Sequence, residues 1–324
     1  MTHLQLPGAA TGRVLPTLLG TTALFLSGCG TSGAGPTTLN GFDLEGSLVP
    51  TEQIKRGGPP RDAIPALTDP EFIPAAQAHW LSPDDRILGV EMNGEARAYP
   101  LNIMNWHEIV NDRFGDDWVA VTYCPLCFSG MAFAAGNDGD RMLFGVSGLL
   151  YNSDVLMYDR ASESLWSQIS ATAITGPHRG DTLDAVPLAN TTWGTWLERH
   201  PESEVLSRDT GYRRDYDRDP YGAYAESREI MFPVEFRARG YHPKERVIGL
   251  DLDGAQKAWP FVELRQTDGR IEDQLGERTV LIEFDDATDT ATAYDADGRE
   301  LASLTAYWFA WYAFHPETAV FTAD

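Results

Sequence analysis

Asp84–Leu101, which reads DDRILGVEMNGEARAYPL, is the stretch that decides the fold. Its apolar residues lead into Asn93-Gly94, a pair typical of a type I′ hairpin turn, and a second run returns to Pro100. The pattern recurs 160 residues later (244 − 84) at Lys244–Phe261, which reads KERVIGLDLDGAQKAWPF. We therefore predict the same β-hairpin twice.

The similarity continues beyond the hairpins, since Val110–Tyr123 matches Ile271–Phe284. Duplicated supersecondary units commonly bury a shared core. The predicted fold class is α+β, mainly β, with two internally repeated β modules and an inserted segment between them. Within a single domain at 67–324, the predicted parts are repeat one at 84–168, the insert at 169–243 and repeat two at 244–324.

The N-terminus predicts export. Residues 14–27 are mostly apolar and have the length of a signal-peptide core, too short for a mature transmembrane helix. Leu26–Cys29 resembles the bacterial lipobox, which implies lipid transfer to the Cys29 thiol and cleavage before it. We expect a lipoprotein signal peptide at 1–28, a tether and lead-in at 29–66, and a protein lipid-anchored in the cell envelope, on the extracytoplasmic face of a membrane.

The charge of the chain limits its partners. The formal net charge is −23, from 25 basic and 48 acidic side chains. So acidic a protein is repelled by the phosphates of nucleic acid and by anionic lipid. The lipid anchor, rather than a basic surface, would hold the protein at the membrane.

The cysteines carry the best candidate chemistry. With Cys29 lipidated, only Cys124 and Cys127 remain, and they form a CxxC motif after a predicted strand at 118–123. Under oxidising conditions outside the cytoplasm, such a pair cycles between thiol and disulfide, binds a metal, or forms a structural disulfide. A structural disulfide closing so short a loop adds only about 2 kcal/mol, which is little for a chain with a full-sized core.

The redox interpretation assigns Cys124 and Cys127 as nucleophile and resolving thiol, acting on a thiol-disulfide partner protein. His107 is then a candidate proton acceptor. The metal interpretation places Cu or Zn on Cys124, Cys127 and His107, or Cu(I) on the thiols with Met104 or Met131. The turn resembles a rubredoxin or zinc-ribbon knuckle, although no second CxxC completes a four-thiolate site.

Further polar and aromatic residues are candidates for binding. Trp106 adjoins His107, and the corresponding segment of the second copy, 265–268, lacks both. A second group follows a glycine-containing turn, where Asx-turn chemistry explains Asn and Asp equally well. Its members are Tyr151, Asn152 and Asp154.

Several motifs together resemble the domain of unknown function 3179 family, over about residues 48–315. They are Gly89–Pro100, Asn105–Glu108, Tyr123–Cys127, Phe144–Asp154 and His242–Arg246. The family has no established reaction, but some relatives are labelled selenoproteins, which implies redox chemistry. Phe128 stands where a glycine is expected after the second cysteine, which weakens the metal-knuckle interpretation.

The predicted function is a membrane-anchored, thiol-based redox protein. The alternatives are a non-enzymatic metal-binding lipoprotein and a ligand-binding surface domain with a structural disulfide. The sequence leaves open whether the protein is an enzyme, its cofactor and its oligomeric state.

Overall fold

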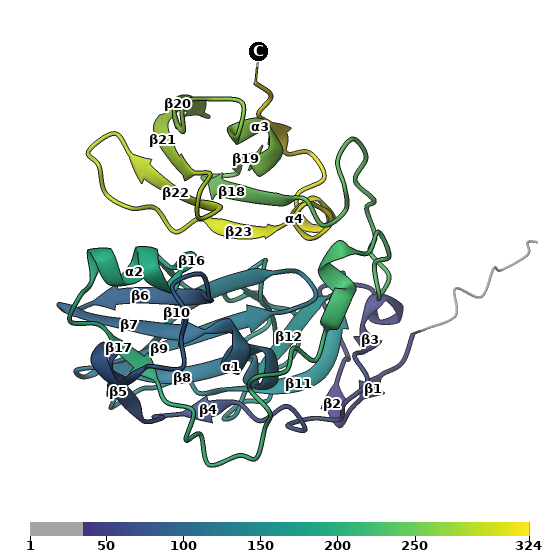
Figure 1. Cartoon of the computed structure of the whole chain (residues 1–324). Helices are drawn as coiled ribbons and strands as arrows, with labels where there is room; N and C mark the ends of the chain where they lie inside the picture. The colour runs from purple at the N-terminus through teal and green to yellow at the C-terminus, as the bar shows by residue number, and fades with distance from the viewer. Residues whose placement is uncertain (1–34, 324) are drawn as a thin grey trace, which may run out of the picture. The chain divides into compact units, whose positions relative to one another are not determined.

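The predicted hairpin at the start of the first repeat is present. β6 (Arg86–Met92) pairs antiparallel with β7 (Glu95–Pro100) (Figure 1). Asn93 and Gly94 join them with φ values of 55° and 79°, and two positive φ angles define the type I′ turn that the sequence predicts. Apolar residues of β6 and β7 are buried, which fixes the register of the pair.

The protein is described here by a computed structural model covering residues 35–323. The predicted signal peptide and the predicted lipidation site, Cys29, lie outside the described residues. Within the described part, no helix is both long enough and apolar enough to cross a bilayer.

The β6–β7 hairpin is the centre of a five-stranded sheet. The strand order of this sheet is β16 (Ala189–Thr192), β6, β7, β17 (Glu204–Leu206) and β5 (Phe72–Pro74). β16 pairs antiparallel with β6, while β17 runs parallel to β7. Strands distant in the sequence thus complete the sheet on both sides.

Two more five-stranded sheets are built around consecutive antiparallel strands (Figure 1). The first has the order β15 (Ala185–Val186), β10 (Ser129–Asn137), β9 (Asp117–Cys124), β8 (Ile109–Phe114) and β4 (Leu67–Thr68). The second has the order β14 (Thr172–Ala173), β13 (Leu165–Ser167), β12 (Asp154–Asp159), β11 (Phe144–Tyr151) and β3 (Lys55–Arg56). β15, β4 and β3, which are edge strands of these two sheets, come from other parts of the chain.

The C-terminal residues form two smaller sheets. One has the order β23 (Leu304–Tyr307), β18 (Arg246–Leu252), β19 (Ala255–Pro260) and β24 (Ala319–Val320). The other has the order β20 (Arg270–Leu275), β21 (Arg278–Asp285) and β22 (Thr290–Asp295). A separate two-stranded ribbon joins β1 (Thr38–Leu39) to β2 (Phe42–Asp43).

The helices are short. The α-helices are α1 (Leu101–His107), α2 (Trp193–Arg199), α3 (Phe261–Leu264) and α4 (Trp308–Phe314). Single 3₁₀ turns are η1 (Thr51–Gln53), η2 (Ala75–Gln77) and η3 (Gly222–Glu226). α1 begins directly after the β6–β7 hairpin and ends at Glu108, whose φ of 59° breaks the helix.

The predicted fold class is wrong. The chain is mostly β, with 40% strand and 12% helix, and its five larger sheets are arranged as a five-bladed β-propeller, not as α+β with two repeated modules and an insert. Residues 169–243 supply β14, β15, β16 and β17 to three different sheets. These strands have two to four residues each, too few for a periodic pattern to reveal them.

Three of the five larger sheets meet in a shared core around the cysteines. A cluster of buried side chains joins the β9–β10 turn, the β11–β12 hairpin, β18, β23 and α4. Cys124 and Cys127 lie in this cluster with Val155, Val247 and Tyr307. The turn carrying both thiols is therefore covered on several sides.

Candidate functional site

The CxxC motif forms the turn between β9 and β10. Cys124 ends β9 and pairs with Ser129, the first residue of β10. The Cys127 amide donates to the Cys124 carbonyl at 3.1 Å, and the Cys127 carbonyl accepts from the Tyr307 amide of β23 at 2.8 Å. Both cysteines are free thiols, and both are buried. The fold therefore holds the turn without a disulfide bond.

The β11–β12 hairpin brings a carboxylate to the thiols. Asn152 and Ser153 have φ values of 52° and 66°, so the hairpin makes a tight turn just before Asp154. The Ser153 carbonyl lies 3.3 Å from Cys127 Sγ and 3.9 Å from Cys124 Sγ, and accepts from both thiols. This turn is the backbone support of the site.

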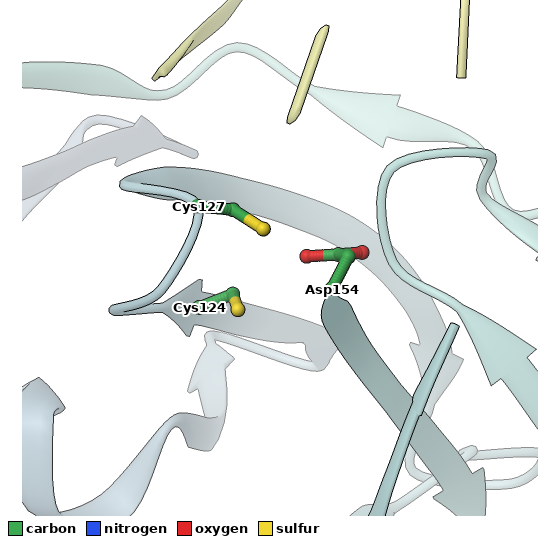
Figure 2. A group of neighbouring side chains, drawn as sticks. All are labelled: Cys124, Cys127 and Asp154. Carbon is green, nitrogen blue, oxygen red and sulfur yellow. The ribbon is translucent and has the colours of Figure 1, made fainter. Parts of the chain in front are cut away.

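Asp154 faces the two cysteines (Figure 2). The two Sγ atoms and one carboxylate oxygen of Asp154 all lie within 4.8 Å of one another, and all three residues are buried. Thiolates and carboxylates are both metal ligands, so these three residues form a donor set close enough together to contact one ion. We call Cys124, Cys127 and Asp154 the Cys₂Asp cluster.

A network of polar side chains orients Asp154. The Ile169 amide donates to Oδ2 at 3.1 Å, and the Ser129 hydroxyl lies 3.3 Å from Oδ1. Ser129 also lies 2.7 Å from Gln168 Oε1, while Gln168 Nε2 donates to Thr122 Oγ1 at 2.8 Å. Supporting hydrogen bonds of this kind fix the geometry of a ligand side chain.

Burial favours the protonated forms of the three groups of the Cys₂Asp cluster. It raises the pKa of the Cys124 thiol, raises the pKa of Cys127 well above its ordinary value, and raises the pKa of Asp154 to about 7. The negative charges also oppose one another, since ionised Asp154 further raises the pKa of both thiols. A cation placed among these groups would relieve both penalties.

Glu108 is a fourth buried acid beside the cluster. Its carbonyl accepts from the Tyr123 amide at 2.7 Å, and Tyr221 Oη lies 3.4 Å from Glu108 Oε1. Burial raises the pKa of Glu108 to about 8, and the charge of Asp154 adds to the effect. Glu108, Leu126 and Tyr221 line a cavity of about 100 Å³.

One cation lies near the thiols. Lys244 is buried, its Nζ donates to the carbonyls of Ser227 at 3.0 Å and Glu229 at 2.6 Å, and it lies 3.6 Å from the Tyr224 ring centroid. Burial lowers the pKa of Lys244 to about 8, and negative charge on Cys127 opposes that shift. Lys244 is thus electrostatically coupled to Cys127.

His107 is engaged away from the sulfur atoms. Nδ1 donates to the Pro65 carbonyl at 2.7 Å, so the neutral ring accepts at Nε2 from Tyr216 Oη, also at 2.7 Å. Burial lowers the pKa of His107 to about 4. Neither thiol is among the hydrogen-bond partners of His107 in the described structure.

The other predicted residues divide between the hairpin and the surface. Trp106 donates from Nε1 to the Arg218 carbonyl at 3.3 Å. Asn152 ties segments together, donating to the Ala313 carbonyl at 3.1 Å and accepting from the Glu235 amide at 2.8 Å. Tyr151 packs edge-on against Phe314. Of the predicted binding residues, only Asp154 joins the cysteines in the cluster.

The two methionines considered for Cu(I) lie in different surroundings. Met104 belongs to a hydrophobic cluster that does not include the cysteines. Met131 packs partly buried against the cluster that contains Cys124 and Cys127.

Sequence reasoning missed Glu108 and the supporting residues Ser129, Ser153 and Gln168. Glu108 directly follows Trp106 and His107, which the corresponding segment of the second copy lacks. Its position in the sequence therefore already marked it as a candidate site residue. An imidazole titrates near neutral pH, so His107 was the more obvious candidate. Helix α1 ends at His107, however, and the side chain of the following residue, Glu108, faces the Cys₂Asp cluster.

Comparison with known proteins identifies a family without a known activity. The family described as "Protein of unknown function (DUF3179)" has a model that matches residues 61–301. Neither the curated proteins nor the solved structures include a match to this chain. Because the matched residues are well over half of the chain, the protein belongs to the DUF3179 family.

Proposed function

We propose that this protein binds a transition-metal ion at the Cys₂Asp cluster. The observation that carries the proposal is the convergence of two thiols and a carboxylate, all buried, within 4.8 Å. Cys124 and Cys127 belong to one short turn and are separated by two residues. Asp154 comes from another hairpin, and hydrogen bonds to its carboxylate orient the side chain toward the thiols. Burying an ionised acid without a positive partner costs free energy, and a bound cation would offset that cost.

Zn(II) is the ion that suits this donor set best. Zinc accepts thiolate sulfur and carboxylate oxygen together, usually with four ligands. Cu(I) prefers soft sulfur ligands, and Asp154 contributes a hard oxygen instead. The Cys124, Cys127 and Asp154 side chains would hold the ion, and zinc would act there as a Lewis acid or a structural cross-link.

Zinc titration of the reduced protein tests the proposal. We expect one equivalent to bind the wild-type protein, and Cys124→Ser, Cys127→Ser and Asp154→Asn each to weaken binding at least about tenfold, as loss of a ligand should. His107→Gln distinguishes this cluster from a site using the imidazole, and Asp285→Asn is a control in an exposed turn. Circular dichroism verifies folding of every variant. Sub-stoichiometric binding, or loss of binding in His107→Gln alone, would overturn the proposal.

Thiol-disulfide exchange is the second candidate function, favoured by two free thiols that share the Ser153 carbonyl. One thiolate would attack a partner protein's disulfide and release one partner thiol. The other would then displace the second, leaving Cys124–Cys127 oxidised and the partner reduced. Burial and raised pKa values disfavour the reactive thiolate. Mass spectrometry of trapped thiols after incubation with an oxidised dithiol protein tests it: unchanged free thiols exclude exchange.

We also propose that the domain is held on the extracytoplasmic face of a membrane through Cys29. This rests on the lipobox-like Leu26–Cys29 and the apolar segment before it. Intact-mass analysis of protein from its native host should show a chain beginning at a lipidated Cys29, and Cys29→Ser should release it from membranes. An unmodified Cys29 in the wild-type protein excludes the anchor.

A further inference from the structure

A second cavity is lined by residues other than the cysteines and Asp154. It has a volume of about 410 Å³, within the range of small-molecule pockets. One wall comes from the sheet of β10 and β15, including Met131, Val186 and Leu188, and the other from the sheet of β18 and β23 with α4. Because β10 contacts β23 directly, the two walls belong to one packed region.

Most of this cavity is apolar. Leu304, Trp311 and Phe314 line it together with Ile169. Such surfaces accept a flat or branched hydrocarbon body, since burying apolar area in a preformed pocket is favourable.

The polar end of the cavity holds an unsatisfied histidine. His315 is 9% exposed, and its buried Nδ1 has no hydrogen-bond partner in the described structure. Nδ1 lies 3.9 Å from Asp251 Oδ2, too far for a direct hydrogen bond, and Gln256 Nε2 donates to the same oxygen at 2.7 Å. The Asp251 side chain is 40% exposed, so a ligand donor can reach its carboxylate and would then lie beside the His315 imidazole.

The charge of this end is negative. Burial lowers the pKa of His315 to about 4, so the imidazole is neutral near pH 7 and does not compensate the Asp251 carboxylate. Among the described residues that line the cavity there is no lysine or arginine. An ammonium group, with three N–H donors and a positive charge, fits these acceptors, whereas a carboxylate ligand would be repelled.

A nearly identical corner elsewhere in the chain lacks the apolar walls. His315 stacks on Trp311 with ring centroids 4.0 Å apart and planes at 35°, and His200 stacks on Trp196 with the same two values. His200 Nδ1 lies 3.9 Å from a Glu91 oxygen. The hollow beside His200 is lined by small and acidic residues, Glu91, Glu95, Glu202 and Glu204 among them. The Trp–His pair is therefore an element of the fold, and only the His315 corner opens into an apolar cavity.

We propose that this cavity binds a small organic amine, with its hydrocarbon part between the apolar walls and its ammonium group at Asp251 and His315. None of the cavity's lining residues belongs to the Cys₂Asp cluster, although the amide of one of them, Ile169, donates to Asp154. The two sites would bind different ligands, and each proposal is tested with its own probes and its own variants. Failure of one proposal therefore leaves the other standing.

Calorimetric titration with three probes of one shape tests the proposal: 2-phenylethylamine, 2-phenylethanol and phenylacetate. The amine should bind saturably with one site, the alcohol about tenfold more weakly, and the acid not at all up to about 10 mM. Asp251→Asn should weaken amine binding at least about tenfold and reduce its preference over the alcohol.

Two further variants separate the cavity from the fold. Ala302→Trp places a bulky ring at an exposed lining position and should abolish binding of the amine without unfolding the protein. Glu91→Gln makes the matching change at the His200 corner and should leave amine binding unchanged. Equal binding of amine and acid, no saturable binding of the amine, or unaltered binding in Ala302→Trp would overturn the proposal.

Discussion

Four residues separate Cys124 from its strand partner Ser129 in the β9–β10 turn, and four separate Asp285 from its partner Thr290 in the β21–β22 turn. The last residue of each turn is left-handed, with φ of 56° at Phe128 and 54° at Asp289. The two turns therefore share their length and a left-handed last residue, which is not glycine in either turn.

Their surroundings differ completely. The β9–β10 turn is covered by the β11–β12 hairpin and β23, so its thiols are buried beside Asp154. The β21–β22 turn is exposed at Asp285 and Asp286. Arg265 forms ion pairs with Asp286 and Asp289 at the surface. One turn geometry becomes a candidate metal site or a solvated surface loop depending on what packs over it.

The largest expected difference between the turns is in proton-linked stability. The pKa of Asp154, about 7, is above the value near 3.9 of an unfolded aspartate, so the folded state binds the extra proton. The resulting stabilisation is complete below about pH 4 and is lost as the pH rises through 7. In metal-free protein at pH 9, Asp154→Asn should therefore raise the free energy of unfolding by about 4 kcal/mol relative to wild type, since each pKa unit corresponds to about 1.4 kcal/mol.

Urea unfolding at pH 5 and pH 9, with a chelator present, measures this effect. Asp285→Asn is the control in the exposed turn, where we expect a change within about 0.5 kcal/mol at both pH values. The burial argument fails if Asp154→Asn and wild type show the same dependence on pH.

The second prediction concerns the pH dependence of zinc affinity. Because burial raises the pKa values of both thiols and of Asp154, zinc must displace protons, and affinity should rise as the pH rises. Release of one proton gives about tenfold per pH unit, hence at least about 100-fold, or about 2.7 kcal/mol, between pH 6 and 8. Competition against a chelator of known pH dependence measures it. Zinc held by exposed carboxylates, already ionised at pH 6, would show almost no change.

A third prediction tests the left-handed position. Phe128 stacks on Tyr307 with ring centroids 5.4 Å apart and lies beside Arg86 and Arg246. Phe128→Gly removes this packing but relieves the positive φ, so we expect a net destabilisation of about 1–2 kcal/mol. Chemical denaturation measures it, with the exposed Ala287→Gly of the other turn as control, expected to cost under about 1 kcal/mol. A stabilised Phe128→Gly would mean that backbone strain outweighs the aromatic contacts.

The smallest effect is expected at Arg265, which pairs with the exposed turn from outside it. Arg265 pairs with Asp286 at 2.9 Å and also with Asp289, and its side chain is 39% exposed. Partly exposed ion pairs are screened by salt, so Arg265→Ala should cost no more than about 1 kcal/mol, and less at 1 M salt. Thermal unfolding at low and high salt measures both values. A larger cost that salt does not reduce would show that this turn depends on buried contacts after all.

Local structure was readable from the sequence because its signals are local. Asn93-Gly94 predicted the hairpin that β6 and β7 form, and the run at 118–123 predicted the strand β9 that ends at Cys124. Predictions that needed long-range pairing failed. The segment at 169–243 contains only very short strands, and their partners lie in sheets whose central strands are distant in the chain.

The candidate site divides in the same way. Cys124 and Cys127 are separated by only two residues, so the sequence alone places them together. Asp154 was among the predicted binding residues, but nothing in the sequence placed its carboxylate beside the two sulfur atoms. Glu108 went unrecognised beside His107, because which of two consecutive side chains faces the site depends on where α1 ends and how β9 continues.

The sequence by itself determined the hairpins, the strand that presents the thiols, and membership of the DUF3179 family. These depend on turn-forming residues and on patterns within one short stretch. Only the tertiary structure decided that three sheets share the core around the cysteines, that Asp154 meets the cysteines, and that His315 opens into an apolar cavity while His200 does not. Burial and electrostatic coupling arise from neighbours that folding brings together. The sequence around a site residue does not indicate which distant residues become its neighbours.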